Sequence, residues 1–499
     1  MTIFHWTGSA GTGVFATAGN WDNAAEAPPG PNDVAIIVDA AKPITGTGAA
    51  RALNFGGTNE VKGHLTATYG CPVNEKLTLA PGSILTTPKL HIGLNFVPNP
   101  PTTDPAIVTV DDSRVVISGC NPPDTFAISI ARIAGNHGTL VVRGAHAVIN
   151  GGNQPMSVGQ DGTGTLTIMQ GAVVTVGNSD PIKYPWALVI GNHPGAKGIP
   201  PSPDIPPSHG IVNVSHASLQ AHGQVIVGRY SVGELHLHER GLVFAEDVAI
   251  GWAPDSGKSD QGNGIVTVKD DGARLIVDNA IEVGHFGVGS LTVEKHGFVS
   301  AGIAVNINGT LSLADGQIET SAFGVNDGGT LTGHGTIIAS AGFVISERGT
   351  ITVHQHLNLI GDLDNAGQIT VAAGGELRCF GTLEDSGSTE LQTDSVASLE
   401  AVADQTITFA GDNAKLVLRS PDAFAGAIEG FGFSGTNHSI ELEAEATPTH
   451  TFADNVLTLT GPGGNVVAQL QMNRAPPYVN NNFDVTPGFP SIIRFRNVP

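Results

Sequence analysis

The sequence predicts an all-β protein: a right-handed parallel β-helix (β-solenoid) with three short strands per coil and capped ends. Glycine accounts for 66 of 499 residues, about twice its average usage. Short segments of alternating apolar and polar residues, bounded by glycine, recur at spacings of 20 to 31 residues. Charged residues make up 14% of the chain and apolar residues 40%. This composition is too apolar for a disordered chain and too rich in glycine for a helical bundle.

Three regions follow from the pattern along the chain. Residues 1–60 are expected to form an N-terminal cap and the first coils, because Trp6 and Trp21 precede an apolar strand at 34–38. Residues 61–378 are expected to form the parallel β-helix. Residues 379–499 drift out of the repeat, which predicts irregular terminal coils and a β-rich C-terminal cap. Caps are needed because the end coils of a solenoid otherwise expose unpaired strand edges.

The central repeat has one buried face, since alternation with a period of two places every second side chain on the same side of a strand. Its copies begin at Gly164, Gly210, Gly233, Gly264, Gly289 and Gly309. The aliphatic pairs expected to point inward are Leu166/Ile168, Val212/Val214, Leu235/Leu237, Val266/Val268, Leu291/Val293 and Leu311/Leu313. A second glycine closes the third strand of most coils, at Gly159, Gly191, Gly228, Gly251 and Gly284. Glycine suits these corners because it adopts positive φ without steric cost.

Three corners are enlarged after this closing glycine, at 94–105, 192–209 and 252–263. Insertions at one corner of a solenoid fall on one face, which is often the binding face. The segments are therefore either solvated, proline-rich loops or the rim of a ligand-binding surface.

Aromatic residues gather at the same corner. Tyr230, Trp252 and Phe286 follow the closing glycines of their coils, and Trp186 leads into the coil before. Aromatic faces at a regular rise suit stacking on sugar rings, so these four are the candidate binding residues. Ordinary corner packing is the alternative, because aromatic residues make up only 5% of the chain.

Charged residues follow the first strand of successive coils. Glu239, Asp270 and Lys295 are the candidate catalytic residues, because a polysaccharide lyase or glycosidase needs carboxylates flanked by cations. The same residue types also favour simple turns, so a solvated face remains the alternative.

No metal or cofactor is expected. His236 and His238, like His354 and His356, lie two apart and point outward, but a metal would need a third ligand. The residue expected beside His236 on the next coil is Thr267. No phosphate-binding loop or dinucleotide fingerprint stands out.

The three cysteines, Cys71, Cys120 and Cys379, have no metal-binding spacing. A Cys71–Cys120 bridge remains open.

The net charge of −22 argues against nucleic acid as a partner, because phosphate binding needs clustered Lys and Arg. No apolar stretch approaches the roughly 18 residues of a membrane span, so membrane insertion is not expected. The first residues lack the basic and apolar regions of a classical secretory signal.

Between about 85 and 360 the pattern V-G-x4-G-x-L-T-V resembles a known family of repeats. It occurs in SVGQDGTGTLTI, IVGRYSVGELHL and EVGHFGVGSLTV, and it is similar to the autotransporter passenger and PEP-CTERM-associated β-strand repeats of secreted bacterial proteins. The resemblance implies a secreted or cell-surface location and a role in adhesion or assembly. It assigns glycines and aliphatic residues only, and no catalytic residue.

Two functions are therefore carried forward. The first is a secreted structural or adhesive β-solenoid of the bacterial surface or extracellular matrix, and self-association is one form that this role can take. The alternative is a polysaccharide-active enzyme (a lyase or glycoside hydrolase) or a carbohydrate-binding parallel β-helix. The sequence leans away from an enzyme. The expected partner is another copy of the chain or a surface polysaccharide.

Overall fold

The protein is all-β. The structure is a computed structural model, and it describes residues 1–23, 27–94, 105–119, 126–177, 185–192, 208–252, 262–284, 286–432, 437–447, 449–473 and 478–496. In these ranges the helical structure is confined to three 3₁₀ turns: η1 (Ala18–Asn20), η2 (Pro421–Ala423) and η3 (Asn480–Asn482). Parallel strand pairing dominates, so the prediction of an all-β protein with a large, mainly parallel sheet is confirmed. No helix in the described part of the chain is long and apolar enough to span a bilayer.

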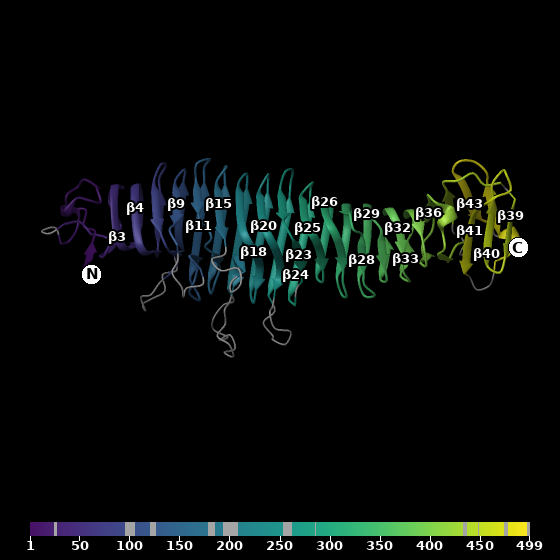
Figure 1. Cartoon of the computed structure of the whole chain (residues 1–499), viewed down its shortest axis with the longest axis horizontal. Helices are drawn as coiled ribbons and strands as arrows, with labels where there is room; N and C mark the ends of the chain where they lie inside the picture. Colours follow the sequence, from purple (N-terminus) through teal and green to yellow (C-terminus); the bar gives the residue numbers. More distant parts are fainter. Residues whose placement is uncertain are drawn as a thin grey trace. The chain divides into compact units, whose positions relative to one another are not determined.

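The chain forms two compact units, Met1–Leu291 and Thr292–Pro499. Figure 1 shows the strands of the first unit stacked in sequence order, from purple to teal. The predicted division at residues 60 and 378 stays a prediction.

The first unit begins with strands that pair in parallel from the N-terminus onward. They are β1 (Ile3–His5), β2 (Val34–Val38), β3 (Ile44–Gly56), β4 (Thr58–Val73), β5 (Lys76–Leu79) and β6 (Ile84–Thr87). Both β3 and β4 are long and pair with more than one strand: β3 with β2 and β4, and β4 in turn with β5, β6 and β7 (Leu90–Ile92).

Three parallel ladders then run through the rest of this unit. The first contains β8 (Ala106–Asp111), β11 (His137–Arg143), β14 (Thr163–Met169), β17 (His209–Ser215), β19 (Val232–His238) and β21 (Asn263–Lys269). The second contains β9 (Arg114–Ile117), β12 (Val148–Asn150), β15 (Val173–Gly177), β18 (Ser218–Arg229), β20 (Leu242–Trp252) and β22 (Arg274–Val277). The third contains β7 (Leu90–Ile92), β10 (Ile128–Ile130), β13 (Met156–Val158) and β16 (Trp186–Asn192), and it continues through β18 and β20 to β23 (Ala280–Val283).

The predicted inward residues form the core of these ladders. Leu166, Val212, Leu235 and Val266 stand beside one another in register on successive strands. All four are fully buried. Burial of each such side chain stabilises the stack by about 1.5–3 kcal/mol. The aliphatic ladder predicted from the alternation is therefore confirmed.

Two coils depart from the expected three short strands. Their second and third strands are joined into one long strand, β18 with 12 residues and β20 with 11, and the pairing between them shifts register between Ala221 and Gln224. A bulge of this kind lets one strand bend around a corner while its hydrogen bonding continues.

The strands of the second unit pair in parallel at first, and the last strands pair antiparallel. The boundary of the two units falls within β24 (Val288–Glu294). The strands after it are β25 (Phe298–Ile307), β26 (Thr310–Val325), β27 (Thr330–Ala339), β28 (Phe343–Ile345), β29 (Thr350–Ile360), β30 (Leu363–Asn365), β31 (Gln368–Val371), β32 (Glu376–Glu384), β33 (Ser388–Leu391), β34 (Val396–Val402), β35 (Thr406–Phe409), β36 (Lys415–Leu418), β37 (Ala427–Glu429) and β38 (Ser439–Leu442). Antiparallel pairs appear among the last strands, which are β39 (His450–Ala453), β40 (Val456–Thr460), β41 (Val466–Asn473), β42 (Phe483–Thr486) and β43 (Ser491–Phe495).

Two cysteines lie in the described residues. Cys71 and Cys379 are both buried free thiols, and burial raises the pKa of Cys71 well above its usual range and that of Cys379 to about 12. Cys120 lies outside the described residues.

Candidate functional site

The aromatic corner of the first unit is built from strand ends and tight turns. Tyr230 follows β18 with φ of +63°, and Phe286 has φ of +62°. Isolated antiparallel bridges join Asn192 to Tyr230 and Trp252 to Phe286 across this corner. The loops predicted here lie largely outside the described residues, because 95–104, 193–207 and 253–261 are not described.

Arg229 lies at the centre of this corner. Its guanidinium carbon is 4.4 Å from the ring centroid of Trp186, 5.0 Å from that of Trp252 and 5.5 Å from that of Tyr230. The aligned ends of β18 and β20 place Arg229 beside Trp252, and β16 supplies Trp186. Three of the four predicted binding residues therefore surround one cation.

A buried apolar floor supports this group. Phe126, Val189 and Ile226 form it, and Trp186 and Trp252 pack against it. Phe286, the fourth predicted binding residue, is 57% exposed at the neighbouring turn.

Burial explains the electrostatics of Arg229. Loss of hydration lowers the pKa of the guanidinium, while the charge and hydrogen bond of Tyr230 oppose that shift. A planar, weakly hydrated cation between aromatic faces is a favourable cation–π arrangement. The ring faces that point at Arg229 are thus occupied by a side chain of the protein itself.

We expect Arg229→Ala to lower the free energy of unfolding of the first unit by about 1–3 kcal/mol, because three ring contacts are lost. Arg229→Lys should recover only part of this, since an ammonium lacks the planar surface that stacks on rings. Urea unfolding followed by tryptophan fluorescence measures both. The control is Arg51→Ala. The guanidinium carbon of Arg51 lies 5.2 Å from the ring centroid of Tyr69, which is exposed. Equal effects of Arg229→Ala and Arg51→Ala would contradict the assignment.

The predicted charged residues lie at turns. Glu239, Asp270 and Lys295 all have positive φ, of 44°, 73° and 50°. Glu239 accepts a hydrogen bond from Ser215 Oγ at 3.2 Å, and His216 Nδ1 lies 3.4 Å from its carboxylate. The backbone carbonyl of Asp270 accepts from the N–H of Ala273, which closes a turn. Lys295 is an exposed residue of the second unit.

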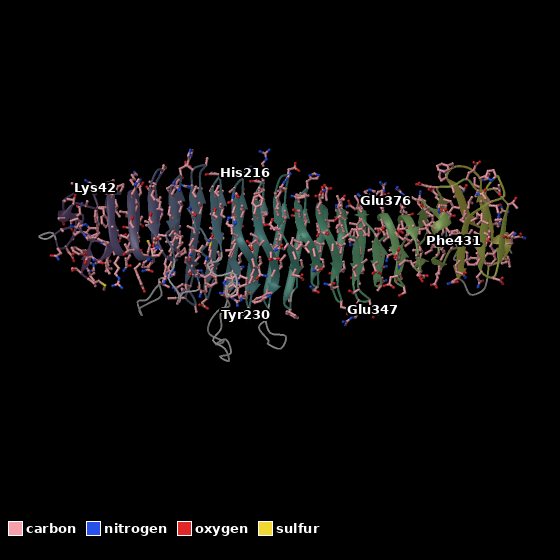
Figure 2. The ribbon with its side chains drawn as sticks, in the orientation of Figure 1. Lys42, His216, Tyr230, Glu347, Glu376 and Phe431 are labelled. Carbon is pink, nitrogen blue, oxygen red and sulfur yellow. The ribbon has the colours of Figure 1, made fainter. Side chains whose placement is uncertain are left out.

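The aromatic and the charged corners are separate. Figure 2 shows Tyr230 and His216, the partner of Glu239, at opposite edges of the stacked strands. The two corners lie at opposite ends of β19, which has seven residues. Each residue of a strand advances the chain by about 3.3 Å, so the length of the strand keeps the two corners apart. The structure therefore does not bring Glu239 together with Tyr230.

A cluster of imidazoles and one carboxylate lies on the outward face between β17 and β19. Glu234 accepts hydrogen bonds of 2.8 Å from His209 Nε2 and from His236 Nε2 through its two oxygens. The rings of His236 and His238 stack with centroids 5.9 Å apart. Sequence reasoning paired His236 with His238 but missed Glu234, which only the register between β17 and β19 brings to His209.

The pKa values in this cluster follow from these contacts. Burial alone would raise the pKa of Glu234, but the hydrogen bonds from His236 and His209 outweigh it and the net shift is downward. Burial, followed by the charge of His236, lowers the pKa of His238.

The histidines and acidic residues do not form a metal centre in the part of the chain that the structure describes: no group of three or more His, Cys, Asp or Glu side chains has the required arrangement. His356, one of the histidines considered for a metal, instead contacts Glu376 Oε2 at 2.7 Å through Nδ1.

Comparison with known proteins finds no family model that matches the chain and no curated protein of similar sequence. Functional assignment therefore rests on the geometry.

Proposed function

We propose that the chain is a secreted structural or adhesive β-solenoid of the bacterial surface or extracellular matrix. The observation that carries the proposal is the continuous parallel register from β14 to β21, in which each inward pair is aliphatic and the outward position between the pair is polar. The series Thr167, Asn213, His236 and Thr267 is one such outward row in the first unit. Such rows present a repeated polar surface, which suits multivalent contact with a matrix or with another copy.

The same proposal includes a right-handed coil with three strands per turn. Three strands per coil are supported by the pairing of β8 with β11, of β9 with β12 and of β7 with β10, each a step of three. A right-handed coil is supported by the rule that parallel crossovers are right-handed in about 98% of cases.

The alternative, a polysaccharide-active enzyme or carbohydrate-binding β-helix, has less support from the site geometry. Trp186 and Trp252 direct ring surface at Arg229. Glu239 accepts a hydrogen bond from Ser215 and contacts His216, which Figure 2 shows at the edge opposite Tyr230. A lyase or glycosidase needs its acidic groups and its sugar-binding surface side by side.

Incubation with a panel of bacterial matrix polysaccharides separates the two functions. We expect the protein to sediment with a matrix polysaccharide or with itself, with no release of reducing ends or unsaturated uronates. The matched variant is Glu239→Gln with Asp270→Asn. Release of products by the wild-type chain that is lost in this variant would overturn the proposal and establish the enzyme.

A further inference from the structure

A regular array of hydroxyl groups lies on the outward face of the second unit. It is formed by six strands, β26, β27, β29, β31, β33 and β35, which pair in parallel and in register. Each strand contributes two outward residues, with one inward residue between them. The first row of the array runs from Thr310 through Thr330 and Thr350 to Thr406. The second row runs from Ser312 through Thr332, Thr352 and Thr370 to Thr408.

These twelve positions, which we call the threonine array, are almost uniform in chemistry. Eight of them are threonine and two are serine. The other two are Gln368 in the first row and Glu390 in the second. Eleven of the twelve side chains are therefore uncharged, and ten carry a hydroxyl group.

Glycines at the corner before each strand keep the two rows aligned. Gly349 and Gly367 directly precede the first outward residues of β29 and β31. A Cβ at Gly349 would lie 2.4 Å from the carbonyl oxygen of Val325, and one at Gly367 would lie 2.4 Å from the carbonyl oxygen of Gly349. Both obstacles are backbone atoms, so these corners close only with glycine, and each strand begins at the same level as the one before.

The array is held rigidly from below. The inward residues between the two rows are aliphatic and at most 1% exposed, at Leu311, Leu331, Ile351 and Ile369. Threonine is β-branched, so its side chain has few rotamers to lose. Thr330 Oγ1 donates to Thr310 Oγ1 at 3.5 Å, which shows that neighbouring hydroxyls in a row are within reach of one another. The order of the array therefore exists before any ligand binds.

The spacing of the array follows from strand geometry. Neighbouring strands lie about 4.8 Å apart, and two residues along a strand span about 6.6 Å. The hydroxyl and methyl groups of the array thus repeat in two directions on one surface. A ligand that fits this surface must be uncharged, must donate and accept hydrogen bonds, and must itself repeat at these two distances.

We propose that the threonine array binds ice. Water molecules in planes of hexagonal ice repeat at distances close to both spacings, and each one donates and accepts hydrogen bonds. The threonine methyl groups fit between the ordered water molecules, while the hydroxyl groups join their hydrogen-bond network. An insoluble polysaccharide fits less well, because sugar-binding surfaces stack rings on aromatic side chains and none of the twelve positions is aromatic. This activity goes beyond the proposed structural function and does not depend on self-association.

The test uses the full chain in a solution from which ice is grown slowly on a cold surface. We expect the growing ice to capture the wild-type protein, whereas proteins that do not bind ice stay in the liquid. Thr332→Tyr should lose most of this capture, because a bulky ring in the middle of the array breaks its flat surface. Glu390→Thr should be captured more than the wild type, because the change removes the one charge and completes the second row.

Thr336→Tyr is the matched control for Thr332→Tyr. Both residues lie on β27 and point outward, but Thr336 follows a register shift in that strand and pairs with Gln317 and Asn358 instead of threonine. The Thr336→Tyr variant should be captured as the wild type is. Circular dichroism should show the same fold for every variant, and the Glu390→Thr gain decides the test if Thr332→Tyr does not fold.

Three results would overturn the proposal: wild-type protein that stays in the liquid, equal capture of Thr332→Tyr and Thr336→Tyr, or no gain in Glu390→Thr. Retention of the wild type on insoluble cellulose or chitin that Thr332→Tyr alone removes, without capture in ice, would also overturn it and assign the array to a polysaccharide. Exclusion from ice would leave the outcome of the polysaccharide-release assay unchanged, so the two proposals fail separately.

Discussion

Gly228→Ala should lower the free energy of unfolding by about 2–5 kcal/mol. The left-handed backbone conformation costs alanine about 1–2 kcal/mol, and overpacking by the added methyl group costs about 1–3 kcal/mol. Gly228 has φ of +76°, which an L-residue rarely adopts. An added Cβ would lie 2.3 Å from the carbonyl carbon and oxygen of Asn263 and 2.5 Å from the nitrogen of Gly264. All of these atoms are backbone, so the neighbouring strand itself would have to shift.

Gly82→Ala is the matched control, because Gly82 has φ of +79° and nothing within 4 Å of an added Cβ. It should show only the dihedral cost of about 1–2 kcal/mol. The midpoints of urea unfolding by circular dichroism measure both. If Gly82→Ala lowers the free energy of unfolding as much as Gly228→Ala does, the loss at Gly228 does not come from close contact with the neighbouring strand.

His438→Ala should cost the second unit about 3–5 kcal/mol, the range for removal of a buried aromatic side chain. His438 is 1% exposed and packs against Phe409 with ring centroids 4.8 Å apart. Its Nε2–H donates to the carbonyl of Gly411 at 2.6 Å, and its Nδ1 accepts from the N–H of Gly432 at 3.2 Å. Both ring nitrogens are used, which requires the neutral imidazole.

The same contacts predict a pH dependence. Burial lowers the pKa of His438 below its ordinary value of 6.5, while the hydrogen bond to the Gly411 carbonyl and the charge of Asp412 oppose that shift. The unfolded chain therefore binds more protons just below pH 6.5, so stability is fully present above that pH and falls as the pH drops through the folded-state pKa. The slope for one group is at most about 1.4 kcal/mol per pH unit.

His438→Gln should remove this component from unfolding curves measured between pH 7 and pH 5. His296→Gln is the control, because His296 is exposed and contacts Asp315 at 2.9 Å. A His438→Gln variant with the wild-type slope would show that His438 does not titrate as a buried group.

The sequence predicted the core because that part of the fold is local. Alternation alone identifies Leu235 and Val266 as inward, and glycine spacing identifies the corners that Gly228 and Gly251 close. These features need no knowledge of which strand lies beside which. The structure then places Leu235 and Val266 side by side.

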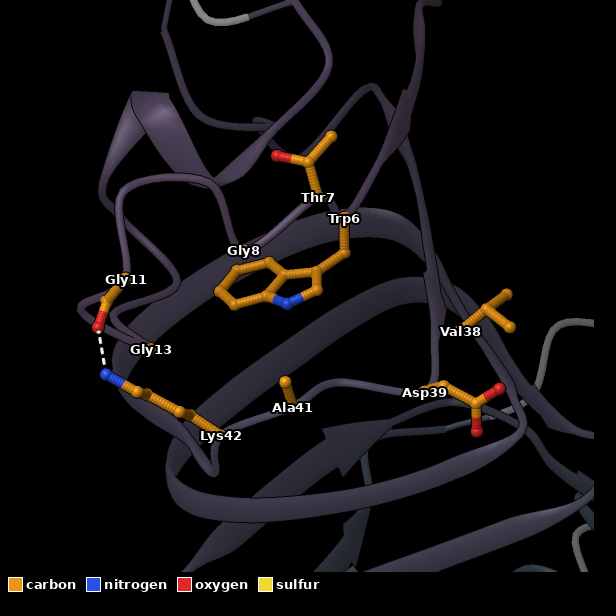
Figure 3. Close-up of a pocket in the computed structure, with 9 residues that line it drawn as sticks. All are labelled: Trp6, Thr7, Gly8, Gly11, Gly13, Val38, Asp39, Ala41 and Lys42. Atoms are coloured by element: carbon orange, nitrogen blue, oxygen red, sulfur yellow. Dashed lines mark hydrogen bonds between the residues drawn. The ribbon is translucent and has the colours of Figure 1, made fainter.

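The contacts at the candidate sites were not predictable in the same way, since each depends on the register between distant segments. Arg229 meets Trp186 from the strand before and Trp252 from the strand after, whereas its position in sequence resembles any corner residue. Asp39 and Lys42 line one pocket with Trp6 (Figure 3), although more than thirty residues separate them from it in the sequence. The assignment of Trp6 to a cap stays a prediction, and the structure shows its ring edge to face with that of Trp21.

The position of the charged residues relative to the aromatic corner was likewise not predictable from the pattern. Tyr230 and Glu239 flank β19 on either side. The two ends of β19 are different corners, and Glu239 accepts a hydrogen bond from Ser215.

Light scattering combined with negative-stain imaging over a range of protein concentrations tests the structural and adhesive function most directly. We expect particles whose mass grows as the concentration rises, because copies of the chain associate. A particle that stays monomeric at every concentration and degrades a polysaccharide would contradict this function.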